Sequence, residues 1–177
     1  MTPVVSIEEY LATSYPDGDR EYLDGQVVER NMGEFRHASI QTLILTWLFN
    51  HYGQFWCVVE CRLRITRSRY RIPDVSLGIT TPPESGPIVD PPFLVVEVLS
   101  PDDRAGAIQA KSASRFAGDL QEKVDDYLSA GVKYIWVVNP ITKRGYVYTA
   151  HGSREAKDGV LRTENPSIEV PLSGVLK

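Results

Sequence analysis

Two acidic residues stand in sequence contexts that are otherwise apolar. Glu97 lies inside the run Leu94–Leu99, and Asp74 follows a proline in the segment 72–77. A carboxylate in an apolar strand is costly unless a metal ion, a cation or hydrogen bonds compensate its charge. Taken singly, Glu97 could pair with an arginine or stand at a sheet rim, and Asp74 could be an ordinary turn residue. Taken together on adjacent strands, the two acids predict a site for Mg²⁺, which prefers oxygen ligands and retains waters.

A lysine in the next helical segment is expected near these acids. Apolar side chains at helical spacing define the inward stripe of that segment: Leu120, Val124, Tyr127 and Leu128. Lys123 borders this stripe, so we expect it to be at least a charge partner of the acids. At most it would orient an attacking water and stabilise phosphoryl charge; the alternative is a lysine whose stem covers the core. Glu122, Asp125 and Asp126 are expected on the outer face.

Three further residues could support such a site. His37 falls on the apolar face of the helix predicted over residues 36–52, near its start, where a histidine more often satisfies the core or a cap than binds a metal. Glu21 precedes the Asp-Gly turn of a predicted hairpin and could supply another carboxylate. Ser100 directly follows the strand that carries Glu97 and could cap a helix.

Arginines crowd one stretch of an otherwise acidic chain. Alternation places two of them on one strand face and two on the next: Arg62 and Arg64, then Arg69 and Arg71. Such a patch could bind nucleic acid through phosphate contacts. An exposed sheet face whose charges prevent edge pairing explains it equally well.

The elements that must position these residues can be read from periodicity and turn residues. The expected order is helix, hairpin, helix, strands, helix and strands, with bounds near 6–14, 21–29, 36–52, 55–65, 69–79, 93–99, up to 130, and 134–138. The apolar runs 93–99 and 134–138, joined by a helix that ends at Gly131, predict a parallel crossover unit. An edge strand at 145–148 and short strands at 159–163 and 168–172 follow. The fold class is therefore α/β (α+β) with a mixed central sheet.

Length and composition limit the remaining possibilities. The chain has 177 residues, a formal net charge of −4 and 42% hydrophobic residues, which predicts one soluble domain with a substantial core. No apolar run is long enough to span a bilayer, and no secretory signal is visible at the start. Cys57 and Cys61 are too far apart along one strand to pair, so we expect two reduced thiols in a cytoplasmic protein.

Several short motifs resemble the Uma-two family of the restriction-endonuclease-like PD-(D/E)XK nuclease superfamily. These are Pro73-Asp74, Glu97-Val98-Leu99-Ser100-Pro101, Lys123-x-x-x-Tyr127, Ala130-Gly131-Val132-x-Tyr134-x-Trp136-Val137-Val138-Asn139-Pro140, Glu21-Tyr22-Leu23-Asp24-Gly25 and His37. The resemblance implies one domain over 1–177 with its core at about 6–150. It also implies metal ligation by Asp74 and Glu97, with Glu21 as an added acid.

Two departures from the superfamily pattern bear on the site. Leu99 stands where the superfamily lysine normally follows the second acid, so that role passes to Lys123, with Lys111 as a weaker candidate. Asn139 replaces the family's usual aspartate before Pro140, at what we interpret as a structural turn. Residues 106–117 are interpreted as an insertion next to the site.

The favoured hypothesis is an endonuclease dependent on Mg²⁺ (or Mn²⁺) that hydrolyses DNA phosphodiesters. Its catalytic residues would be Asp74, Glu97, Lys123 and Glu21. The missing lysine at position 99 keeps open a catalytically inactive nuclease-fold module that binds nucleic acid or a protein partner. A metal-binding protein with another phosphoester substrate is a third reading. A homodimer would suit cleavage of both strands.

Overall fold

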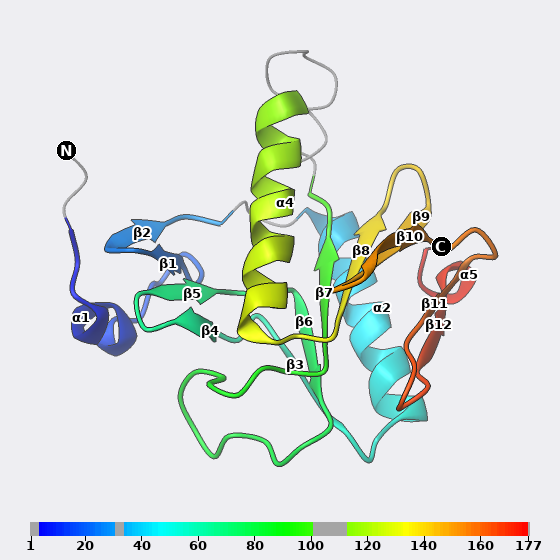
Figure 1. Cartoon of the computed structure of the whole chain (residues 1–177), viewed down its shortest axis with the longest axis horizontal. Helices are drawn as coiled ribbons and strands as arrows, with labels where there is room; N and C mark the ends of the chain where they lie inside the picture. Colours follow the sequence, from blue (N-terminus) through cyan, green and yellow to red (C-terminus); the bar gives the residue numbers. More distant parts are fainter. Residues whose placement is uncertain (1–3, 31–33, 101–112, 177) are drawn as a thin grey trace.

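The computed structural model describes residues 4–30, 34–100 and 113–176. Its centre is a six-stranded sheet with the strand order β10-β9-β8-β7-β6-β3, beside which stands a four-stranded sheet with the order β2-β1-β5-β4 (Figure 1). No helix in these ranges is long and apolar enough to cross a membrane.

The six-stranded sheet is mixed, as the apolar runs predict. Its strands are β3 (Trp56–Val59), β6 (Val75–Gly78), β7 (Leu94–Val98), β8 (Tyr134–Asn139), β9 (Arg144–Thr149) and β10 (Gly152–Glu155). Strands β7 and β8 pair in parallel and every other neighbouring pair in this sheet is antiparallel. All five residues of β7 are buried, which confirms the prediction of a strand covered on both faces. Strand β9, expected at an edge, is instead interior because β10 pairs with it.

The four-stranded sheet holds the predicted hairpin and half of each long strand expected downstream. Its members are β1 (Glu21–Leu23), β2 (Gln26–Val28), β4 (Leu63–Thr66) and β5 (Arg69–Arg71). Asp24 and Gly25 both have positive φ, as a two-residue hairpin turn requires.

The single strands expected over 55–65 and 69–79 are each divided between the two sheets, which corrects those predictions. Strands β3 and β6 belong to the large sheet, whereas β4 and β5 belong to the small one. Between β3 and β4 the chain turns at Glu60, whose φ is +49°. Cys57 and Cys61 are free, as expected, although they do not share one strand.

Helices α2 (Phe35–His51) and α4 (Ala113–Ala130) cover opposite faces of the large sheet. Val96 of β7 packs in one core cluster with residues of α2, whereas its neighbour Val95 packs in a second cluster with residues of α4. Successive strand residues point to opposite faces, so the alternation places one helix on each side. The short helix α1 (Ile7–Ala12) is capped by Ser6, which accepts from the Glu9 N–H at 3.1 Å.

Part of the segment expected to be an insertion at 106–117 belongs to α4. Residues 113–117 form the beginning of α4, so helix replaces the expected loop there. Residues 106–112, including Lys111, lie outside the described residues. Helix α4 ends at Ala130, directly before Gly131, whose φ is +101°.

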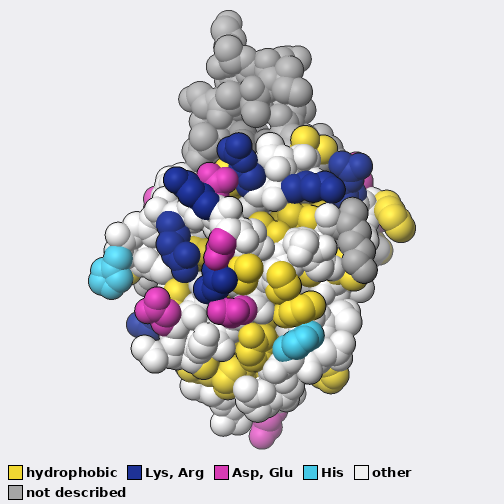
Figure 2. All heavy atoms as spheres, turned by 90° about the vertical axis from the view of Figure 1, so that its right-hand side faces the viewer, with side chains coloured by type: hydrophobic (Ala, Val, Ile, Leu, Met, Phe, Trp, Pro, Cys, Tyr) yellow, Lys and Arg dark blue, Asp and Glu magenta, His cyan; other side chains and the backbone are white. Residues whose placement is uncertain are grey.

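The chain beyond residue 150 contributes to the main core. Strands β11 (Val160–Arg162) and β12 (Glu169–Pro171) form a two-stranded sheet, and helix α5 (Leu172–Val175) follows. Leu161 and Val170 are fully buried in the cluster that packs against α2. Figure 2 shows Lys and Arg beside Asp and Glu on the face at this side of the molecule, with hydrophobic side chains exposed between them.

Candidate active site

Asp74 lies at the bend between β5 and β6, where three different segments hold it. Its side chain is buried, and Oδ2 accepts from the Val98 N–H of β7 at 2.6 Å. Oδ1 faces Nη2 of Arg30 at 3.0 Å and Nε2 of His37 at 3.3 Å. The Gln41 side chain of α2 donates to the Asp74 carbonyl. The carboxylate is therefore fixed from β7, from α2 and from the segment before α2.

Glu97 projects from β7 toward α4 and is held there by two side chains one helical turn apart. Lys123 Nζ lies 3.2 Å from Oε2, and the Tyr127 hydroxyl donates to Oε1 at 2.5 Å. The spacing of four residues brings both to one face of the helix. The prediction that Lys123 lies beside the second acid is confirmed in position, and the Lys123-x-x-x-Tyr127 motif describes the pair that holds Glu97.

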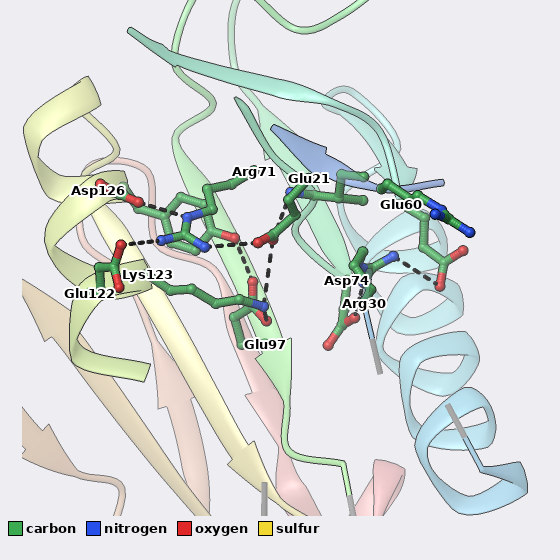
Figure 3. A network of polar contacts seen from close by, with 12 residues as sticks. Glu21, Arg30, Glu60, Arg71, Asp74, Glu97, Glu122, Lys123 and Asp126 are labelled. Carbon is green, nitrogen blue, oxygen red and sulfur yellow. Dashed lines mark hydrogen bonds and ion pairs between the residues drawn. The ribbon is translucent and has the colours of Figure 1, made fainter. Parts of the chain in front are cut away.

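Glu21 joins the same group from β1. Its Oε1 lies 3.7 Å from Lys123 Nζ, and its Oε2 accepts from Arg71 Nη1 at 2.8 Å (Figure 3). The Ile72 N–H also donates to Oε1. Lys123 therefore bridges Glu21 and Glu97, which come from different sheets.

The expectation that the acids of α4 face outward is wrong for Asp126, whose side chain is 15% exposed, whereas Glu122 is exposed as expected. Asp126 accepts from Nε of both Arg69 and Arg71, at 2.8 and 2.6 Å, and Glu122 pairs with the same two arginines. Because α4 packs against β4 of the small sheet and pairs with the arginines of β5, its charged side is partly covered. These ion pairs join the two sheets through the helix.

Three of the four arginines expected to contact nucleic acid are engaged inside the protein. Arg62 forms a bidentate pair with Asp19, donates to backbone carbonyls of the first helix and stacks over Tyr10. Arg69 and Arg71 form the network just described, and Arg71 is only 4% exposed. Arg64 is half-buried on β4 and has no ion pair among the described residues. The stretch is therefore built mainly for packing of the small sheet.

The two supporting residues predicted from sequence also lie at the site. His37 is buried near the start of α2, and its Nε2 lies 3.3 Å from Oδ1 of Asp74. Ser100 is buried and lines the same cavity as both acids.

Sequence reasoning missed Arg30. This residue lies between β2 and α2 in no periodic pattern, and its contact with Asp74 spans 44 positions of sequence. The sequence contains no local signal that would have identified it.

One cavity of about 370 Å³ brings the predicted acids and the lysine together. Asp74, Glu97, Glu21 and Lys123 line it, together with Arg30. The register that pairs Val75 with Val96 places Asp74 opposite Glu97 one step further along the two strands. Although Asp74 is held from the side of α2 and Glu97 from the side of α4, both acids reach the same opening.

Burial and neighbouring charge move the pKa values of the two acids in opposite directions. Burial raises the pKa of Glu97, as do Asp74 and Glu21, and Lys123 only partly offsets this. Burial would also raise the pKa of Asp74, but the hydrogen bond and charge of His37, with Arg30, hold it below the ordinary value. Neighbouring carboxylates typically separate in this way. Glu97 is therefore the acid of the pair that takes up a proton first as the pH falls.

Lys123 is held as a cation. Burial would lower the pKa of its ammonium, but Glu97 and Glu21 raise it well above the ordinary value. A lysine in this state donates hydrogen bonds and stabilises negative charge, and it does not act as a base near neutral pH.

The donor set fits a magnesium ion that keeps most of its water. Within the described ranges, no group of three or more His, Cys, Asp or Glu side chains could by itself hold a metal ion. Mg²⁺ commonly binds through one or two carboxylates and retains several waters, which Asp74 and Glu97 can provide. All four of their oxygens already accept from groups of the chain, so a cation would have to share or replace those contacts.

The mixed sheet, its flanking helices and the acid–lysine cluster at the end of β7 define a restriction-endonuclease-like fold. Residues 7–175 match the Uma2 family, described as "Putative restriction endonuclease", and the chain belongs to this family. The resemblance seen in the sequence motifs is thereby confirmed, and membership supports a nuclease function.

A solved structure has the same fold. It is the crystal structure of a "putative nuclease belonging to DUF820" from Anabaena variabilis ATCC 29413, with a TM-score of 0.73 and 17% sequence identity over 97% of each chain. No match was found among curated proteins.

Proposed function

We propose that this protein is an endonuclease that hydrolyses DNA phosphodiesters and depends on Mg²⁺ or Mn²⁺. The observation that carries the proposal is the meeting of Asp74 and Glu97 in one cavity with the Lys123 ammonium 3.2 Å from Glu97. Membership in the Uma2 family supports the same reaction class.

Asp74 and Glu97 would hold the cation, which would supply Lewis-acid activation of the phosphodiester and of the attacking water. Lys123 would orient that water and stabilise the charge that develops on the phosphate. Glu21 and Tyr127 keep the ammonium and the Glu97 carboxylate in place, and His37 fixes Asp74 by contact with Oδ1. Because Lys123 is protonated, it acts through its charge and its N–H groups.

A second candidate is a nuclease-fold module that binds nucleic acid or a protein partner without cleaving. The observation in its favour is that the chain's own donors already satisfy every oxygen of Asp74 and Glu97. Leu99, at the position where the superfamily normally has its lysine, also supports this second candidate.

The deciding experiment measures cleavage of supercoiled and linear DNA with Mg²⁺, Mn²⁺ or EDTA. Wild type is compared with D74N, E97Q and the matched control D90N, whose carboxylate is exposed in a distant loop. We expect metal-dependent cleavage by wild type and D90N, and at least about a hundredfold loss in D74N and E97Q. Equal activity in all four proteins would contradict the assignment of the site. Binding without cleavage by wild type would favour the second candidate, and light scattering tests the expected homodimer.

A further inference from the structure

Arg30 occupies a position in the cavity that the proposed reaction has not used. Its side chain is 18% exposed and lies between a buried and an exposed carboxylate. Nη2 is 3.0 Å from Oδ1 of Asp74, whereas Nη1 is 3.7 Å from Oε1 of Glu60, whose side chain is 54% exposed. Figure 3 shows Arg30 with these two acids, apart from the group around Lys123. The guanidinium therefore connects the first acid with the outside of the site.

The contacts of Arg30 differ from those of the other arginine in the cavity. Every nitrogen of the Arg71 guanidinium has its own carboxylate, since Nε pairs with Asp126, Nη1 with Glu21 and Nη2 with Glu122. Arg30 has one close ion pair and one long one, and no partner of its Nε is found in the described ranges. A guanidinium binds carboxylate or phosphate best through two parallel N–H groups. All three nitrogens of the Arg71 guanidinium are therefore occupied, whereas Arg30 can still bind an anion through two parallel N–H groups.

The charge next to Asp74 points to the same residue. Six carboxylates and three permanent cations line the described part of the cavity, and Arg30 is the permanent cation that contacts Asp74. A divalent cation on Asp74 would place further positive charge directly beside this guanidinium, and a phosphodiester anion can compensate that charge. Oδ1 of Asp74 would then be shared between a metal and a guanidinium, two groups that repel each other. Besides Asp74, the described partner of Arg30 is Glu60 at 3.7 Å, so Arg30 can move more readily than Arg71, which three carboxylates hold.

We propose that Arg30 exchanges partners during the reaction, pairing with Asp74 when no metal is bound and with the substrate phosphate when a divalent cation takes Asp74. This inference rests on the proposed function, because it requires both a cation and a phosphodiester at the site. It makes Arg30 a competitor of the metal and at the same time a ligand of the substrate. A purely structural arginine would support both kinds of binding or neither.

Two binding measurements without turnover test the exchange. Mn²⁺ affinity is measured by electron paramagnetic resonance in the absence of DNA, and DNA affinity by fluorescence anisotropy with Ca²⁺ as the cation. For R30Q we expect about tenfold tighter Mn²⁺ binding and about tenfold weaker DNA binding. The slope of log DNA affinity against log salt concentration should also fall by about one, which corresponds to the loss of one phosphate contact. The matched control R64Q removes a charge from β4 and should leave Mn²⁺ affinity unchanged.

R30K keeps the positive charge but removes the planar guanidinium with its paired N–H groups. It replaces R30Q in both measurements if R30Q does not fold. We expect wild-type Mn²⁺ affinity and weaker DNA binding from R30K. Equal Mn²⁺ affinity in R30Q and wild type, or weakening of both metal and DNA binding, would overturn the exchange while leaving the proposed function intact. A wild-type protein that binds no Mn²⁺ would overturn the proposed function, and the exchange with it.

Discussion

The Val98 N–H donates to Oδ2 of Asp74 at 2.6 Å, so one strand carries the second acid of the site and also holds the first. Val98 directly follows Glu97 on β7, and Asp74, the residue before β6, lies opposite Glu97. Any displacement of β7 along its axis would therefore move both carboxylates together. The distance between the proposed metal ligands is set by strand pairing, which is more rigid than a loop.

Replacement of Lys123 by methionine should destabilise the protein as well as inactivate it. The ammonium lies between Glu97 and Glu21, and its loss would leave two buried carboxylates facing each other. Breaking a buried pair by removing one partner costs about 3–5 kcal/mol. Urea unfolding at neutral pH measures this cost. The double variant K123M/E97Q should recover part of it, and a single variant as stable as wild type would contradict the ion-pair assignment.

Removal of the Arg71 side chain should loosen the contact between α4 and the small sheet. Arg71 pairs with Glu21, Glu122 and Asp126, so R71M leaves three acids without this partner. We expect a loss of about 3 kcal/mol in the free energy of unfolding. R64M is the matched control and should change stability by less than about 0.5 kcal/mol. Similar losses in both variants would show that the network contributes nothing specific.

The contribution of Glu21 to stability should depend on pH. Burial would raise the pKa of this carboxyl, but Lys123 and Arg71 outweigh burial and hold it below the ordinary value of 4.5. A lowered folded pKa means that the stabilisation is fully present above pH 4.5 and is lost as the pH falls through the folded value. The stability difference between wild type and E21Q should therefore be constant near neutrality and shrink in acid. E84Q, in an exposed loop, should show no such trend, and a difference that grew in acid would refute the assignment.

Gly78 should not tolerate alanine. A Cβ at this position would lie 2.0 Å from Cε2 of Trp56, its partner across β3 and β6. Because ring atoms of a half-buried tryptophan cannot yield easily, G78A should cost about 1–3 kcal/mol. The double variant W56L/G78A should remove the clash, and S85A, in an exposed loop, is the control. Thermal unfolding of the four proteins measures the effect, and unchanged stability of G78A would show that the strand pair adapts.

Much of the site was predictable because its signals are local. An apolar strand interrupted by one acid identified Glu97, and the stripe Leu120, Val124 and Tyr127 placed Lys123 at its border. Each pattern depends on the period of a single element, which a sequence records directly. The hairpin that carries Glu21 was equally visible from its Asp-Gly turn.

What could not be predicted depends on contacts between distant segments. The change of sheet at Glu60 divides what reads as one continuous strand, because periodicity alone does not show which sheet a strand joins. Asp126 was expected to face solvent because the small sheet, which supplies its arginine partners, leaves no mark on the helix's own apolar pattern. Arg30 meets Asp74 only through the fold, so no short-range signal pointed to it.

The bridge that Lys123 forms between Glu21 and Glu97 also determines when the site can exist during protein synthesis. The three residues come from the beginning, middle and later part of the chain, and a nascent polypeptide acquires its ammonium last. A fragment that stops between residues 97 and 122 carries these acids without the ammonium that pairs with them. Under the proposed function, a chain that terminates before residue 123 would therefore be inert toward the DNA of the cell that makes it, because it lacks Lys123.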